Sequence, residues 1–188
     1  MNIAGLREHS FNLKGKHVFL RPMMEYDWDT IVKWETDPEI LYWSDGNPGY
    51  PRTPDNVKYI FRTVSQHAYC FIIEYKNKPV GDCWLQEMNL KPVLEQFPGK
   101  DCRRIDLVIG EKRLWGKGLG TDVIQTLTAF AFMVEEADVV FGVPFDYNAR
   151  SRKAFEKAGY SFKMKLEEPA GSRAKYCDVL AAYRPVSG

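Results

Sequence analysis

The sequence has little of what a metal centre or a disulfide framework requires. Its four cysteines are dispersed without a Cys-x-x-Cys pair, and its three histidines lie nowhere near one another in ligand spacing. This pattern predicts no metal site. It favours free thiols in a reducing cytoplasm over the alternative of two disulfides. The residues concerned are Cys70, Cys83, Cys102 and Cys177, and His9, His17 and His67.

Long apolar runs and a charge surplus are also missing. The longest apolar run, Ala129 to Val134, is far too short to cross a bilayer, and the N-terminus lacks the apolar core of a signal peptide. A net charge of +1 gives no general attraction to nucleic acid or to a membrane. We therefore expect a cytoplasmic monomer or homodimer that has neither of these as a partner.

A length of 188 residues, an apolar fraction of 45% and the absence of repeats suit one domain over residues 1–188. The expected elements begin with a leader over 1–15. Strands are predicted over 16–22, 68–76, 79–89, 102–109, 139–145, 160–167 and 174–183, and helices over 27–36, 53–65, 119–134 and 148–158. Pro38 is expected to stop the first helix, while 41–53 and 90–101 are predicted loops.

The stretch from Ile105 to Thr121 is the most informative part of the chain. An apolar strand runs into a turn with glycines at 116, 118 and 120, and a helix follows directly. Glycines allow a close backbone approach, and the start of a helix presents unpaired N–H groups and a positive dipole end. This arrangement predicts a binding site for an anion such as a phosphate.

Spacing separates three glycine-rich phosphate motifs. A P-loop fails, because five residues rather than four separate Gly110 from Gly116 and because Gly118 replaces the magnesium-binding hydroxyl. A dinucleotide fingerprint fits poorly, because its third glycine comes one position early and the turn lies past mid-chain. The pattern Arg/Gln-x-x-Gly-x-Gly/Ala is matched at every position by residues 113–118, Arg-Leu-Trp-Gly-Lys-Gly. A generic α/β unit with a tight glycine turn is the alternative.

This third pattern resembles motif A of the GNAT superfamily of acyl-CoA-dependent N-acyltransferases. A second block agrees in order and separation: an apolar strand over 139–145, then Asn148-x-x-Ser151, then Glu-Lys-Ala-Gly-Tyr at 156–160. The resemblance implies an α/β (α+β) fold in one domain, with a mixed, mostly antiparallel central sheet flanked by helices. The sheet would be splayed where the arm of the cofactor enters.

The resemblance also implies acetyl-CoA as cofactor and a set of residues that contact it. Backbone amides of the glycine turn would hold the pyrophosphate, and the backbone near Val108 would contact the thioester oxygen. The implied cofactor-binding residues are Val108, Ile109, Arg113, Leu114, Gly116, Lys117, Gly118, Leu119, Gly120, Thr121, Asn148, Ser151, Phe155 and Lys157.

Asp106 is the strongest candidate for binding or deprotonating the acceptor amine, because a carboxylate can hold an ammonium and accept its proton. The pair Ile105-Asp106 is similar to the Ile-Asp pair of aminoglycoside 6'-N-acetyltransferases. The alternative is a surface aspartate paired with Arg104 or Lys112. Glu87 and Asp82 are weaker acidic candidates for the acceptor site, and Trp43 belongs to an acidic, aromatic segment that could line a pocket for a cationic amine.

Two departures from the family bear on the acceptor and the mechanism. Val143 stands before Pro144 where the aminoglycoside enzymes carry a second acid, which puts an antibiotic substrate in doubt. Phe155 replaces a tyrosine that can protonate the departing thiolate in many GNAT enzymes. Unassisted or water-assisted departure is favoured, since a thiol pKa near 8.5 makes coenzyme A a good leaving group. Tyr147 as the acid and a non-catalytic acyl-CoA sensor are the alternatives.

The first interpretation is therefore transfer of an acetyl group from acetyl-CoA to a primary amine by direct attack, with an aminoglycoside-like polyamine as the first candidate acceptor. The alternative acceptor is a protein N-terminus, as in ribosomal-protein acetyltransferases.

Overall fold

A computed structural model describes residues 5–47, 49 and 52–185. The strands are β1 (Leu13–Lys14), β2 (Val18–Pro22), β3 (Ala68–Tyr75), β4 (Lys78–Glu87), β5 (Cys102–Ile109), β6 (Val139–Gly142), β7 (Ser161–Glu167) and β8 (Tyr176–Tyr183). The helices are α1 (Trp28–Glu35), α2 (Pro38–Ser44), α3 (Pro54–Ser65), α4 (Lys91–Leu94), α5 (Leu119–Met133) and α6 (Ala149–Lys157), with 3-10 turns η1 (Glu25–Asp27) and η2 (Lys112–Leu114).

The strands form one mixed sheet in the order β1-β2-β3-β4-β5-β6-β8-β7. Neighbouring strands are antiparallel except β5 and β6, which are parallel and pair only from Cys102 to Arg104. Beyond Arg104, β5 continues along β4 while β6 follows β8. The sheet therefore opens between the ends of β5 and β6, and the predicted splay is confirmed.

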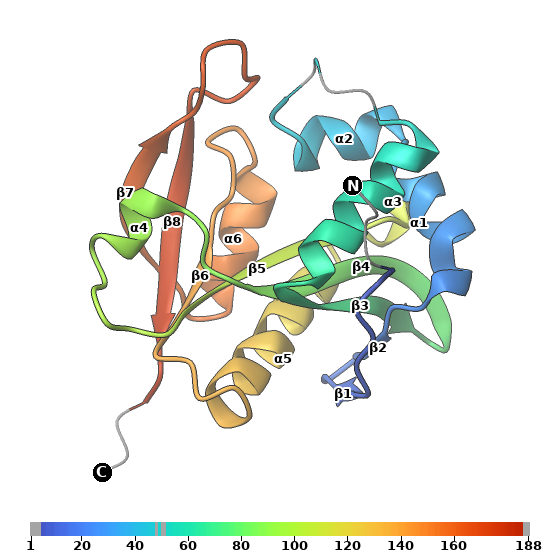
Figure 1. Ribbon diagram of the computed structural model, residues 1–188, viewed down its shortest axis with the longest axis horizontal. Coiled ribbons are helices and arrows are strands. Elements are labelled where there is room, and N and C mark those ends of the chain that lie inside the picture. The colour runs from blue at the N-terminus through green and yellow to red at the C-terminus, as the bar shows by residue number, and fades with distance from the viewer. Residues whose placement is uncertain (1–4, 48, 50–51, 186–188) are drawn as a thin grey trace.

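Helices cover both faces of the sheet (Figure 1). On one face, α5 and α6 pack on the strands through a core that includes Val123, Leu127 and Phe155. On the other face, α1 and α3 cover β3 and β4 around Ile31, Phe61 and Ile72, while α4 covers β5, β6 and β8. Both faces of β6 are thus buried, as its near-continuous apolar sequence predicts.

Local sequence signals explain several features of the backbone. Thr53 caps α3 with its hydroxyl, and Pro54 occupies the first helical position. Gly81 lies at a bulge, where Val80 has no partner on β3. A Cβ on Gly81 would lie 2.1 Å from the carbonyl oxygen of Val108, so glycine also allows β4 and β5 to approach.

Five predictions about elements were wrong. Pro38 ends α1 but also starts α2, because the Asp37 side chain accepts hydrogen bonds from two amides of that helix. The predicted loop over 41–53 is therefore helical as far as Ser44. The loop over 90–101 contains α4, anchored by buried Val93, and the leader contains β1 paired with β2.

The helix predicted over 119–134 also differs at its last residue, Val134. The helix ends at Met133, and Val134 is 52% exposed. The hairpin turn is also one residue earlier than expected, at Lys76 and Asn77, whose φ values of 52° and 58° suit a two-residue turn. In the part of the chain that the structure describes, every helix is too short or too polar to cross a bilayer.

Candidate active site

The glycine turn lies at the open end of the sheet, between the end of β5 and the start of α5. Gly116 and Gly118 have φ values of 76° and 83°, a region that other residues adopt only with strain. A Cβ at either position would meet no atom within 4 Å. These glycines are therefore required by backbone conformation and not by crowding, and the space beside them is free for a ligand.

Gly118 is also the N-cap residue of α5, a helix of 15 residues. The unpaired N–H groups and the positive end of this helix face the turn. The turn is therefore suited to bind an anion. Gly120 differs from the other two, because it lies in the first turn of α5 against Leu107 and Ala154. A Cβ at this position would make ordinary contacts, at 3.6 Å from Leu107 and 4.0 Å from Ala154, so the packing does not require glycine here.

Arg150, in the first turn of α6, is a cation in an unusual setting beside this turn. Its guanidinium lies 4.0 Å from the ring centroid of Trp115 and 5.0 Å from that of Trp43. Burial lowers the pKa of Arg150, with Glu39 opposing this. Among the described residues, Arg150 has no ion pair. We did not single out Arg150 from the sequence, because its position between two indoles depends on the docking of α2 and α6.

The indole of Trp115 is held in place, since its Nε1 donates to the carbonyl oxygen of Ile109 at 2.6 Å. Leu114 and Leu119 are buried under the turn and fix its two ends in the core. Arg113 and Lys117 project into solvent beside it, and Thr121 follows in α5. Val108 and Ile109 form the end of β5 and lie along the opening of the sheet.

The predicted residues on α6 have mainly structural contacts. Asn148 caps α6 by accepting from the amide of Ser151 at 3.0 Å, and its Nδ2 donates to the carbonyl oxygen of Trp43 at 2.9 Å. The ring of Phe155 is buried on Gly142 and edge-on to Tyr160. Lys157 is exposed at the far end of α6.

Asp106 lies on β5 where the sheet has begun to open. Its Oδ2 accepts three hydrogen bonds, from Trp84 Nε1 at 3.1 Å, Gln86 Nε2 at 3.1 Å and Arg104 Nε at 2.7 Å. Within the described chain its other oxygen, Oδ1, has no hydrogen bond, and the side chain is 33% exposed. Asp106 therefore pairs with Arg104, as its structural interpretation predicted, while half of the carboxylate is available to a ligand.

Two predicted roles of residues around Asp106 are not supported by the geometry: Lys112 as its ion-pair partner and Glu87 as a second acid of the acceptor site. Lys112 does not pair with Asp106 but with Asp37 and Glu39, both at 3.0 Å. Glu87 faces the opposite side of the sheet, because its register partner is Arg103 while Gln86 pairs with Arg104. The structure does not bring Glu87 to Asp106.

Helix α2 forms a wall beside the opening. The Tyr147 hydroxyl donates to the carbonyl oxygen of Tyr42 at 2.8 Å, and its ring stacks on Phe145. Burial raises the pKa of Tyr147. The hydroxyl is thus already used in binding α2 and does not point freely toward a departing thiolate.

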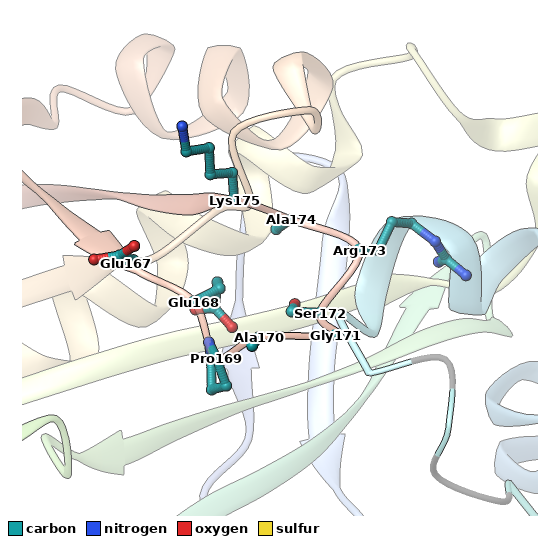
Figure 2. A pocket seen from close by; sticks show the side chains of 9 residues that line it. All are labelled: Glu167, Glu168, Pro169, Ala170, Gly171, Ser172, Arg173, Ala174 and Lys175. Atoms are coloured by element: carbon teal, nitrogen blue, oxygen red, sulfur yellow. The ribbon is translucent and has the colours of Figure 1, made fainter.

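The β7–β8 loop binds the same C-terminal end of α2 and completes this wall. Figure 2 shows Arg173 extending toward α2 from a hollow lined by residues 167–175. Arg173 Nη1 donates to the carbonyl oxygen of Tyr42 at 3.0 Å, and Ser172 Oγ donates to that of Gly46 at 2.9 Å. Figure 1 shows the loop and α2 side by side.

Residues 25–60 hold eight acids and three bases, and much of this acidic surplus is paired within the protein. The basic partners are Arg52 inside the segment and Arg21, Arg62 and Lys112 outside it. The pairs are Glu25–Arg62, Asp27–Arg21, Asp37–Lys112, Glu39–Lys112 and Asp45–Arg52. Most of the surplus therefore stabilises α1–α3 and is not free to attract a polycation. Among the described residues, no group of His, Cys, Asp and Glu side chains is placed to hold a metal ion.

Comparison with known proteins decides what this opening belongs to. Residues 17–161 match the family described as Acetyltransferase (GNAT) domain. The chain belongs to the GNAT acetyltransferase family. It is therefore an N-acetyltransferase that uses acetyl-CoA, as the glycine turn and the second sequence block predict.

Individual relatives agree on the fold. The chain is 26% identical over 167 residues to aminoglycoside N(6')-acetyltransferase type 1 of Klebsiella pneumoniae, covering 82% of this chain and 79% of that enzyme. It is similar to AAC(6')-Ib in complex with ribostamycin and coenzyme A (TM-score 0.76, 21% identity, 90% and 94% coverage). It is also similar to Mycobacterium smegmatis RimJ in complex with CoA-disulfide (TM-score 0.74, 15% identity, 92% and 86% coverage).

The residues at the opening fit coenzyme A. The left-handed glycines leave space where a side chain would otherwise lie, and Arg150 supplies a cation without an acidic partner among the described residues. A diphosphate needs both features. Residues 116–121 and Arg150 would hold the phosphates. The bound cofactor supplies an acetyl thioester that is already activated toward amines.

Proposed function

We propose that this GNAT enzyme acetylates a primary amine that binds to Asp106, and that an aminoglycoside-like polyamine is the first candidate acceptor. The observation that carries the proposal is the half-occupied carboxylate. Trp84, Gln86 and Arg104 fix Oδ2, so that Oδ1 is held in one orientation at the opening of the sheet. A fixed carboxylate can orient an incoming ammonium and accept its proton directly or through water.

The backbone and the side chains then have separate tasks. The glycine turn and Arg150 bind the cofactor, the end of β5 near Val108 lies beside the thioester, and Asp106 binds the amine. Direct attack needs no nucleophile on the protein. The buried Phe155 and the engaged hydroxyl of Tyr147 support departure of the thiolate without a tyrosine acid.

A protein N-terminal amine is the second candidate acceptor. The neutralisation of the acidic segment favours an acceptor with a single ammonium over a highly charged one. We also propose the cytoplasm as the compartment, since the four cysteines are buried free thiols that a reducing environment preserves.

Thiol release from acetyl-CoA with a panel of amines and peptides tests the proposal. Asp106→Asn should lower kcat/KM for the acceptor by about a hundredfold or more, because the amine loses its charge partner and proton acceptor. Acetyl-CoA affinity should not change. Glu87→Gln is the matched control on the opposite face and should retain full activity. Equal activity of Asp106→Asn and the wild type across the pH range would return Asp106 to a structural role.

A further inference from the structure

Asp82 on β4 is a buried acid without a partner. The residue is 1% exposed, and neither carboxyl oxygen has a hydrogen bond within the described chain. Asp122 shows how this protein satisfies a buried acid that serves the fold, because its oxygens accept three backbone N–H groups from residues 16–18. An unpaired buried carboxyl group lowers stability, so a function is the more informative explanation of Asp82.

The charged group that interacts electrostatically with Asp82 is another buried acid. Glu35, at the end of α1, is 6% exposed and interacts electrostatically with Asp82. Arg52 Nη1 lies 3.8 Å from Glu35 Oε2, but its Nε donates to Asp45 Oδ2 at 2.9 Å. One guanidinium thus serves two carboxyl groups, and Asp82 has no basic partner among the described residues. The cluster Asp82, Glu35, Asp45 and Arg52 is short of positive charge.

This cluster lies on the same face of the sheet as Asp106. Asp82 pairs in register with Val108, and Trp84 pairs with Asp106, so the two aspartates are diagonal neighbours on adjacent strands. Side chains in this relation are about 7–8 Å apart. At the other end of the cluster, Asp45 precedes the backbone of Gly46 that binds the β7–β8 loop. The cluster therefore extends from the wall of the opening to a point beside Asp106.

We propose that Asp82 and Glu35 bind a second ammonium group of the acceptor while Asp106 binds the reacting amine. The acceptor class is then a diamine or polyamine whose amines lie roughly 7–8 Å apart. This inference rests on the proposed acetylation at Asp106. It explains how an enzyme whose other acids are neutralised still selects a polyamine.

Binding of the second ammonium should release protons. Burial and the nearby Glu35 raise the pKa of Asp82 well above its usual range, and burial raises the pKa of Glu35 to about 7 despite Arg52. Cys70 also faces Asp82, and burial raises the pKa of its thiol, while Asp106 lies diagonally across from Asp82 on β5. Glu35 is thus partly protonated at neutral pH, and burial favours the protonated form of Asp82 as well. An entering ammonium favours the carboxylates, and the displaced proton goes to solvent.

A matched pair of amines tests the subsite. 1,5-Diaminopentane and pentylamine differ by one ammonium, and calorimetry on the enzyme with coenzyme A bound, in two buffers of different ionisation enthalpy, counts the protons released. We expect the diamine to release protons and the monoamine to release none. The KM of the diamine should be at least tenfold lower.

Variants assign this difference to the cluster. Asp82→Asn and Glu35→Gln keep the side-chain shapes, and each should raise the diamine KM about tenfold and abolish proton release. Asp55→Asn, an exposed carboxyl on α3, is the control and should change neither. Unchanged proton release in Asp82→Asn and Glu35→Gln, or an equal loss for both amines, would overturn the subsite.

The two proposals fail in different ways. Proton-coupled binding of the diamine without thiol release would disprove the proposed acetylation and leave the subsite standing. Thiol release from both amines with equal KM and no proton release would disprove the subsite and leave the proposed acetylation standing.

Discussion

Gly118 offers the sharpest test of the cofactor site. It has a φ of 83°, and a Cβ added to it would have no atom within 4 Å, so two effects of a substitution can be separated. The first is backbone strain, which costs about 1 kcal/mol for a side chain in the left-handed region. The second is the interaction of the new side chain with a ligand bound in the free space beside the turn.

Gly118→Asp adds a negative charge at the turn where the pyrophosphate would bind. A carboxylate roughly 5 Å from a phosphate charge costs about 3 kcal/mol in an effective dielectric constant of about 20. The affinity for acetyl-CoA should therefore fall more than a hundredfold, since about 1.4 kcal/mol corresponds to a factor of ten. Isothermal titration calorimetry measures this directly.

Gly99→Asp is the matched control for strain. Gly99 has a φ of 72° and the same free space around its Cβ, but it lies before the start of β5, whereas the turn follows its end. Both variants should lower Tm by a few degrees, and only Gly118→Asp should lose acetyl-CoA. Gly118→Asn keeps the size without the charge and should lose less. Undiminished acetyl-CoA affinity in a folded Gly118→Asp protein would refute the assignment of the turn.

Three further predictions concern other contacts. Tyr147→Phe should remain active in the thiol-release assay, because its hydroxyl already binds a backbone carbonyl of α2, and Phe155→Tyr should change turnover less than tenfold; a Tyr147→Phe enzyme that binds acetyl-CoA but releases no thiol would make Tyr147 the acid. Arg150→Met should weaken acetyl-CoA binding about tenfold in calorimetry, whereas Arg113→Met, whose side chain is 74% exposed, should have a smaller effect. Equal losses would argue against Arg150. Since the pKa of Glu35 is raised from 4.5 to about 7, its contribution to stability is present below pH 4.5 and is lost as the pH rises through 7; denaturant unfolding should show Glu35→Gln gaining on the wild type between pH 5 and 8, by on the order of 1 kcal/mol, and a constant difference would contradict the raised pKa.

The cofactor half of the site could be predicted from the sequence because its geometry is local. A glycine that must adopt a positive φ, a strand before it and an amphipathic helix after it lie within residues 105–134, so spacing alone places the anion site. The caps Thr53 and Asn148 could be recognised for the same reason, since each contacts an amide three residues ahead.

The acceptor half depended on contacts between distant segments. The acids of residues 25–45 suggested a pocket for a cationic amine. Their partners, however, include Arg62, 37 positions from Glu25, and Lys112, 75 positions from Asp37. Composition shows charges without showing which of them meet. Helix α2 was missed because proline ends one helix and starts the next, and its docking then decides where Arg150 lies.

Asp82 shows most clearly which properties of a residue only the tertiary structure decides. In the sequence it is one of several acids on a hairpin, and alternation places it on the opposite face from Glu87 without showing which of the two is buried. The register of β4 against β5 and the packing of α1 bury Asp82 beside Glu35 and leave Glu87 in water. The sequence determined the position of the anion site because the backbone conformation there is local. Tertiary packing decided which acids are free to bind an amine, because the availability of a charge depends on burial and on partners far along the chain.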